Sequence, residues 1–390
     1  MRIFKEWADK YKGKFDDGWD AYRERVFKRA KQKRWIPQDA ELTPRDPTMA
    51  AWHDIPEDEK PFQRRLMEIA AGFAEHVDVQ VGRLVDEIER LGYGDNTIIF
   101  YIWGDNGSSA EGQNGTISEL LTQNGIPTTV SQHIRALDQI GGLDVLGSPL
   151  TDNQYHAGWA WAGSTPYKGT KLLASHFGGT RNPMAVRWPA KIKPDPVPRS
   201  QFHHCNDIVP TVYEILGITP PRRSMVFSRI RSTASALPIA STMRRPQANC
   251  IRSTSKSWGA VPSTTTAGWR RLLAHESRGF LVCRRDWTPD KDKWELYNLE
   301  EDWSQANDVA AKFPQKLAQL KELFIIEAAK NKVLPIGGAL FVPMYHPELR
   351  LAPSYTRWGF YWRYGAHPGV LCAGARQQAQ HSQHRYGTPH

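Results

Sequence analysis

The sequence is poor in cysteine. Its 390 residues include four, at Cys205, Cys250, Cys283 and Cys372, and no two of them form a Cys-x-x-Cys pair. This spacing argues against a disulfide framework and against a structural zinc site. We therefore expect reduced thiols, which are typical of a cytoplasmic protein.

Long apolar runs are also absent. No stretch reaches the length of about 18 consecutive apolar residues that a membrane-spanning helix needs. The opening residues, MRIFKEWADKYKGKFDDGW, contain no apolar segment of the kind found in a signal peptide. We expect no membrane partner and a cytoplasmic location.

Acidic residues are missing from one long window. Residues 215–275 contain ten Lys and Arg and no Asp or Glu. The net charge of the whole chain is +10, so the rest of the chain carries equal numbers of acidic and basic residues. A nucleic-acid-binding protein usually spreads its positive charge over a folded face that bears a recognition motif. No such motif is visible here, and we expect no nucleic-acid partner.

The sequence does contain clear helix and strand patterns. Apolar residues recur every three or four positions over residues 61–92, which predicts a long amphipathic helix. Residues 97–103 are mostly apolar β-formers and predict a buried strand. Further helices are expected at 17–32, 117–123 and 206–218 and from Pro314 onward, and a further strand at 184–188. This succession is typical of an α/β domain.

The predicted strand at 97–103 ends in chemically useful residues. Gly104, Asp105, Asn106 and Gly107 follow it directly, and α/β folds place their sites at the carboxyl ends of strands. A hard cation prefers oxygen ligands, which a carboxylate beside an amide carbonyl supplies. Flanking glycines let the backbone bend so that both side chains converge. The same letters also occur in ordinary turns, so the residues alone leave both interpretations open.

Three segments in this order, FYIWGDNGSSAEG, TKLLASHFGGTRNP and WELYNLEEDWSQANDVA, resemble the sulfatases, in particular the large bacterial arylsulfatases. The resemblance implies an α/β fold. It would be a partial alkaline-phosphatase-like sandwich, with a mixed sheet and flanking helices but without its N-terminal strands, plus the remnant of a smaller C-terminal α+β domain. Residues 1–222 would be the later part of the catalytic domain and 268–345 the C-terminal region. We expect 223–267 and 346–390 to be irregular.

The resemblance also assigns roles to individual residues. Asp105 and Asn106 match the paired ligands of the family's calcium ion, and Lys171 matches the lysine that contacts the sulfate group. Lys168 is an alternative for the lysine role. The implied substrate is an aryl sulfate or another sulfate ester. We expect the nearby histidines to be neither catalysts nor a ligand pair: His176, His203 and His204.

The nucleophile that the resemblance implies is missing. The family converts a cysteine in Cys-x-Pro-x-Arg or Cys-x-Ala-x-Arg to formylglycine, and none of the four cysteines has this context; Cys372, in CAGAR, comes nearest. The nucleophile and further metal ligands would lie upstream of Met1, so we expect an N-terminally truncated chain that is inactive alone. Shifted reading frames of DNA that can encode residues 224–267 and 358–390 read like sulfatase sequence, so we expect frameshifts there.

Three functions are compatible with the sequence. The first is an arylsulfatase-type hydrolase, of which this chain holds the later part. The second is a non-catalytic sulfatase remnant that binds a divalent ion weakly at most. The third is a basic nucleic-acid-binding protein, which depends only on the arginine-rich residues 222–271. The first accounts for all three motifs, and we therefore favour it.

Overall fold

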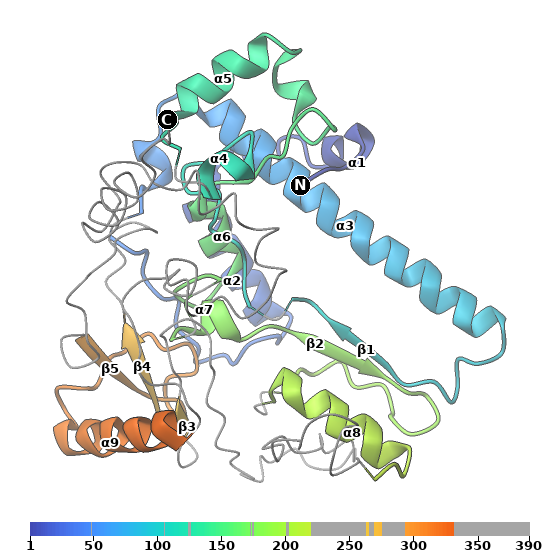
Figure 1. The fold of residues 1–390 in the computed structure, drawn as a ribbon, viewed down its shortest axis with the longest axis vertical. Helices are drawn as coiled ribbons and strands as arrows, with labels where there is room; N and C mark the ends of the chain where they lie inside the picture. The colour runs from blue at the N-terminus through green and yellow to red at the C-terminus, as the bar shows by residue number, and fades with distance from the viewer. Residues whose placement is uncertain are drawn as a thin grey trace, which may run out of the picture.

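The computed structural model describes residues 1–47, 49–104, 106–123, 126–171, 173, 175–199, 203–219, 263–264, 269–274 and 293–330 (Figure 1). The elements in these residues are α1 (Lys5–Asp9), α2 (Gly18–Gln32), η1 (Trp52–Asp54), α3 (Lys60–Arg90), β1 (Ile99–Ile102), α4 (Glu119–Gln123), α5 (Val130–Asp138), η2 (Gly142–Val145), α6 (Ala157–Gly163), α7 (Phe177–Thr180), β2 (Met184–Arg187), η3 (Cys205–Asp207), α8 (Ile208–Ile215), β3 (Ser263–Thr264), β4 (Trp269–Ala274), β5 (Lys293–Asn298) and α9 (Pro314–Lys330).

The long helix α3 carries the first part of the core on its N-terminal half. Phe62, Leu66 and Ile69 are fully buried, and they pack with buried residues of α1, α5 and the loop after η2. Helix α1 lies so close that a side chain at Gly72 would meet the backbone of Trp7. The C-terminal half of α3 runs away from this core toward β1 (Figure 1). No helix in the described part of the chain is long and apolar enough to span a membrane.

A cluster of aromatic rings forms the second part of the core. Trp19 of α2 stands edge-on to Trp159 of α6, with ring centroids 5.6 Å apart. Trp19 also stacks flat on His156, at 4.3 Å. Helices α2 and α6 are held together by these contacts, and α6 leads directly into the segment that carries Lys168 and Lys171.

The described strands form two small antiparallel sheets. Strands β1 and β2 pair from Ile99 with Arg187 to Ile102 with Met184. Strands β3, β4 and β5 form the second sheet in that order. Helix α9 packs on β5, where the rings of Trp294 and Phe324 lie 5.8 Å apart.

The α/β class expected from the sequence is confirmed, and most expected elements occur within a few residues of their predicted ends. One interpretation was wrong: the strand at 97–103 is not buried. Ile102 and Trp103 are 37% and 44% exposed, because β1 pairs only with β2 among the described strands. Its apolar residues therefore lie on a two-stranded ribbon. The predictions of irregular structure at 223–267 and 346–390 lie largely or wholly outside the described residues.

Candidate functional site

The loop that follows β1 is shaped by glycine. Gly104 and Gly107 adopt φ of 77° and 79°, a left-handed conformation that is costly for other residues. A Cβ atom on Gly107 would lie 2.0 Å from the carbonyl oxygen of Gly178, so the loop touches the double glycine before β2. Asn106 is exposed, and Asp105 lies outside the described residues.

Lys171 is bound to this same loop in two ways. Its backbone N–H donates to the carbonyl of Ser108 at 2.9 Å, and its Nζ lies 2.7 Å from Oε2 of Glu111. The Ser109 hydroxyl donates to the same carboxylate oxygen, also at 2.7 Å. The side chains of Lys171 and Glu111 are 28% and 17% exposed. The fold therefore brings the predicted sulfate-contacting lysine to the loop that follows the predicted metal ligands.

Glu111 is the residue that sequence reasoning missed. It lies inside the quoted motif, but nothing in its spacing indicated a partner sixty positions away. Burial raises the pKa of Glu119, and the negative charge of Glu111 raises it further. Burial likewise raises the pKa of Tyr155 to about 12, and Glu111 adds to the effect. An anion that binds Lys171 therefore approaches the negative charge of Glu111.

Lys168 points to a different partner. Its Nζ lies 3.2 Å from Oε2 of Glu295 on β5, and it also donates to the hydroxyl of Tyr297. The two candidate lysines therefore have separate partners, and only Lys171 is bonded to the loop after β1 in the described structure. The two lysines therefore face different parts of the fold.

The passage through the double glycine is tight. A Cβ on Gly178 would lie 2.0 Å from the carbonyl oxygen of Gly169, and one on Gly179 would lie 2.4 Å from that of Leu173. His176, just before the pair, has its Nε2 3.4 Å from Glu295. His204 accepts a hydrogen bond from the backbone of Asn206 at its Nδ1, at 3.1 Å, which caps η3.

The described residues contain no complete metal centre. No three His, Cys, Asp or Glu side chains among them come together as a possible metal site. The amide oxygen of Asn106 suits a calcium ion chemically, and the carboxylate of Asp105 would be the natural second donor. These two residues alone are fewer ligands than calcium takes in proteins.

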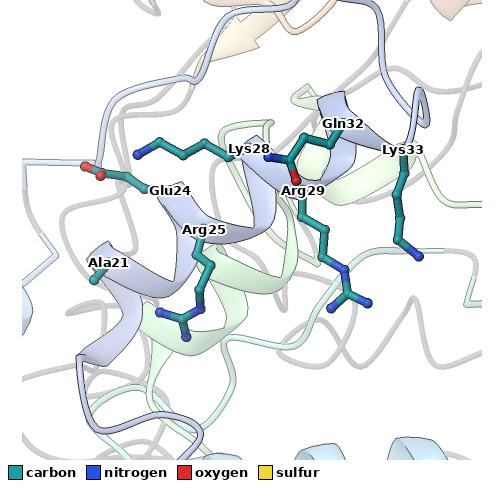
Figure 2. Close-up of a pocket in the computed structure, with 7 residues that line it drawn as sticks. All are labelled: Ala21, Glu24, Arg25, Lys28, Arg29, Gln32 and Lys33. Atoms are coloured by element: carbon teal, nitrogen blue, oxygen red, sulfur yellow. The ribbon is translucent and has the colours of Figure 1, made fainter.

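A shallow pocket lies elsewhere, along the exposed face of α2 (Figure 2). It is lined by Ala21, Glu24, Arg25, Lys28, Arg29, Gln32 and Lys33. Its long side chains extend from one helix into solvent, and none of them is a sequence-predicted site residue (Figure 2). We assign it no part in the site around Lys171.

A model of the sulfatase family matches residues 2–218. The chain is 24% identical over 341 residues to an uncharacterized sulfatase of Schizosaccharomyces pombe, covering 85% of this chain and 55% of that protein. It is 23% identical over 216 residues to an arylsulfatase of Klebsiella aerogenes, covering 55% of this chain and 43% of that one. The chain thus spans about half the length of the curated relatives it matches.

Two solved structures are also similar to it. One comes from work on glycosaminoglycan metabolism by Bacteroides thetaiotaomicron and is 21% identical in sequence. The alignment covers 70% of the present chain and 46% of the solved one, with a TM-score of 0.38. The other was solved with its substrate D-glucosamine-2-N,6-O-disulfate and is 16% identical in sequence. The alignment covers 71% of the present chain and 43% of the solved one, with a TM-score of 0.37.

Proposed function

The chain belongs to the sulfatase family, and on that premise we propose that it forms the later part of an arylsulfatase-type site for the hydrolysis of sulfate esters. The observation that carries this proposal is the attachment of Lys171 to the loop after β1, through Ser108 and Glu111. In a sulfate-binding site, this attachment would keep a cation at the loop that follows the predicted metal ligands.

Lys171 would act by electrostatic stabilisation. A lysine ammonium held in a half-buried position favours a bound anion and the negative charge that develops in the transition state of its reaction. Glu111 holds the ammonium in place before the substrate arrives, and the Ser109 hydroxyl donates to the same carboxylate oxygen. When a sulfate group binds, it would replace Glu111 as the partner of Lys171.

Asp105 and Asn106 would contribute two oxygen ligands to a calcium ion. A bound calcium ion would supply positive charge opposite the sulfate oxygens. The support for this role is the chemistry of the two donors and the position of the loop that carries them.

We further propose that this chain binds a sulfate ester without turning it over alone. None of its cysteines lies in Cys-x-Pro-x-Arg or Cys-x-Ala-x-Arg, so the sequence contains no cysteine in the context of the nucleophile that the resemblance implies. Loss of a nucleophile costs orders of magnitude in rate. In this chain the Lys171 cation would contribute to sulfate-ester binding. In a site that also contained the nucleophile, it would contribute to catalysis as well.

The test is calorimetric titration of the full chain with 4-nitrophenyl sulfate in the presence of calcium. We expect Lys171→Ala to weaken binding by roughly 10- to 100-fold, the value of a charge-assisted hydrogen bond. The matched control is Lys191→Ala, because Lys191 is exposed; it should leave the affinity unchanged. Equal binding by the Lys171→Ala variant would refute the role of this lysine. Release of 4-nitrophenol by the unmodified chain would refute its inactivity.

A further inference from the structure

Strand β5 contributes a buried carboxylate that is bonded to a distant segment of the chain. Oε2 of Glu295 accepts hydrogen bonds from the hydroxyl of Tyr297 at 2.5 Å and from Nζ of Lys168 at 3.2 Å. Nε2 of His176 lies 3.4 Å from the same oxygen. Lys168 and His176 precede Glu295 by more than a hundred positions, so one carboxylate oxygen joins β5 to both ends of residues 168–176.

The cluster is arranged as a stable ion pair rather than as a reactive group. Burial alone would raise the pKa of Glu295, but the hydrogen bond from His176 and the charge of Lys168 outweigh it and hold that pKa well below its usual range. Burial lowers the pKa of His176, and this effect exceeds the opposing influence of Glu295. A proton on Nε2 of His176 would be donated to Oε2 of Glu295, which lies 3.4 Å away.

The chain after β5 also contacts the segment beyond His176. The backbone N–H of Phe177 donates to Oε1 of Gln305 at 2.9 Å. The guanidinium of Arg181 lies 4.0 Å from the ring centroid of Trp303 and donates to its carbonyl at 3.4 Å. Helix α7, which contains Phe177, is thus attached to the C-terminal part of the chain (Figure 1).

Lys171 lies between the two anchored positions. Its own contacts with Ser108 and Glu111 face the loop after β1, whereas Lys168 and His176 face β5. Residues 168–176 are therefore held from two sides, and the side toward β5 contains no residue that the proposed function uses.

We propose that Glu295 is a positioning residue: by bonding to Lys168 and His176 it fixes residues 168–176 and so holds Lys171 against the loop after β1. This inference rests on the proposed function for the meaning of that position, but the anchoring itself does not need sulfate. It assigns the C-terminal sheet a role in shaping the sulfate-binding half of the site.

The test compares Glu295→Gln with the unmodified full chain at neutral pH by two measurements that need no sulfate. Hydrogen exchange by mass spectrometry should show residues 168–176 exchanging about tenfold faster or more in the variant, with residues 60–90 unchanged. The acetylation rate of the Lys171 amine should rise to a similar degree. The matched control is Glu300→Gln, an exposed glutamate just beyond β5, which should change neither rate.

A second pair of variants covers the case in which Glu295→Gln does not fold. Lys168→Met removes the cation but leaves the other hydrogen bonds to Glu295, and it should raise both rates. Lys168→Arg keeps the ion pair and should raise neither. A folded Glu295→Gln or Lys168→Met variant with unchanged exchange over 168–176 would overturn the anchor. Faster exchange with an unchanged acetylation rate would overturn the link to Lys171.

Sulfate binding separates this inference from the proposed function. If the unmodified chain binds 4-nitrophenyl sulfate, Glu295→Gln should weaken the affinity about tenfold through the freed segment; an unchanged affinity would overturn the positioning role. If the unmodified chain binds no sulfate ester, the proposed function fails. The exchange and acetylation rates still decide whether Glu295 holds Lys171 in place.

Discussion

Protonation of His156 should destabilise the fold in a narrow range of pH. The imidazole is buried, stacks on Trp19, and accepts a hydrogen bond from the backbone N–H of Gly158 at Nδ1, at 2.9 Å. Burial lowers its pKa from 6.5 to about 4. A proton on Nδ1 would also remove the acceptor that caps α6.

The direction and the size of this loss of stability follow from the pKa of His156 in the folded and unfolded states. Because the folded-state pKa lies below the unfolded one, the stabilising contribution is complete above about pH 6.5 and is lost as the pH falls toward 4. At 1.36 kcal/mol per pKa unit, the loss is about 2 kcal/mol at pH 5 and about 3 kcal/mol at pH 4.

The comparison uses His156→Asn. An asparagine at this position can accept the Gly158 N–H through its side-chain oxygen, and it does not titrate. Losing the ring stacked on Trp19 lowers stability by an amount that is the same at every pH. Urea unfolding followed by tryptophan fluorescence should therefore show the free-energy difference between the two proteins changing by about 2 kcal/mol between pH 7.5 and pH 5. If the unfolding free energies of the unmodified protein and of His156→Asn changed in parallel with pH, the assignment of a buried neutral His156 would be refuted.

Two further substitutions test the packing around the site. Arg23 donates from within the core to several carbonyl oxygens and has no carboxylate partner in the described structure. Arg23→Met should therefore lower the free energy of unfolding, measured by urea titration, by at least about 3 kcal/mol. Arg29→Met, on the exposed face of the same helix, is the control and should change it by no more than about 0.5 kcal/mol. Gly107→Ala should cost at least about 2 kcal/mol by the same assay, because its φ is strained and its Cβ would overlap the Gly178 carbonyl. Gly104→Ala has the strained φ without the overlap and should cost about 1 kcal/mol; equal losses for the two glycines would contradict the close approach.

Some local structure escaped sequence reasoning although its signals were present. Thr129, the residue before helix α5, forms a capping box with Gln132, and its side chain accepts a hydrogen bond from the Gln132 backbone N–H. The spacing Thr-x-x-Gln is a known signal for the start of a helix. Strand β5 overlaps the third of the three motifs, and the sequence offered no reason to single out Glu295 within it.

The candidate site was predictable in part. The glycine-flanked loop after a strand was predictable, since it depends on a few adjacent residues. The partners of the lysines were not: Glu111 lies 60 positions from Lys171, and Glu295 lies 127 from Lys168. Such pairs form only when separate segments meet.

The sequence by itself determined the family and the main helices. The three sulfatase-like motifs and their order along the chain can be read directly from the sequence. An apolar residue every three or four positions produces a helix such as α3 from local geometry alone. Only the tertiary structure decided which lysine faces the loop after β1, and whether that strand is covered. Burial and pairing are properties of two surfaces in contact, and the second surface is specified by residues far away in the sequence.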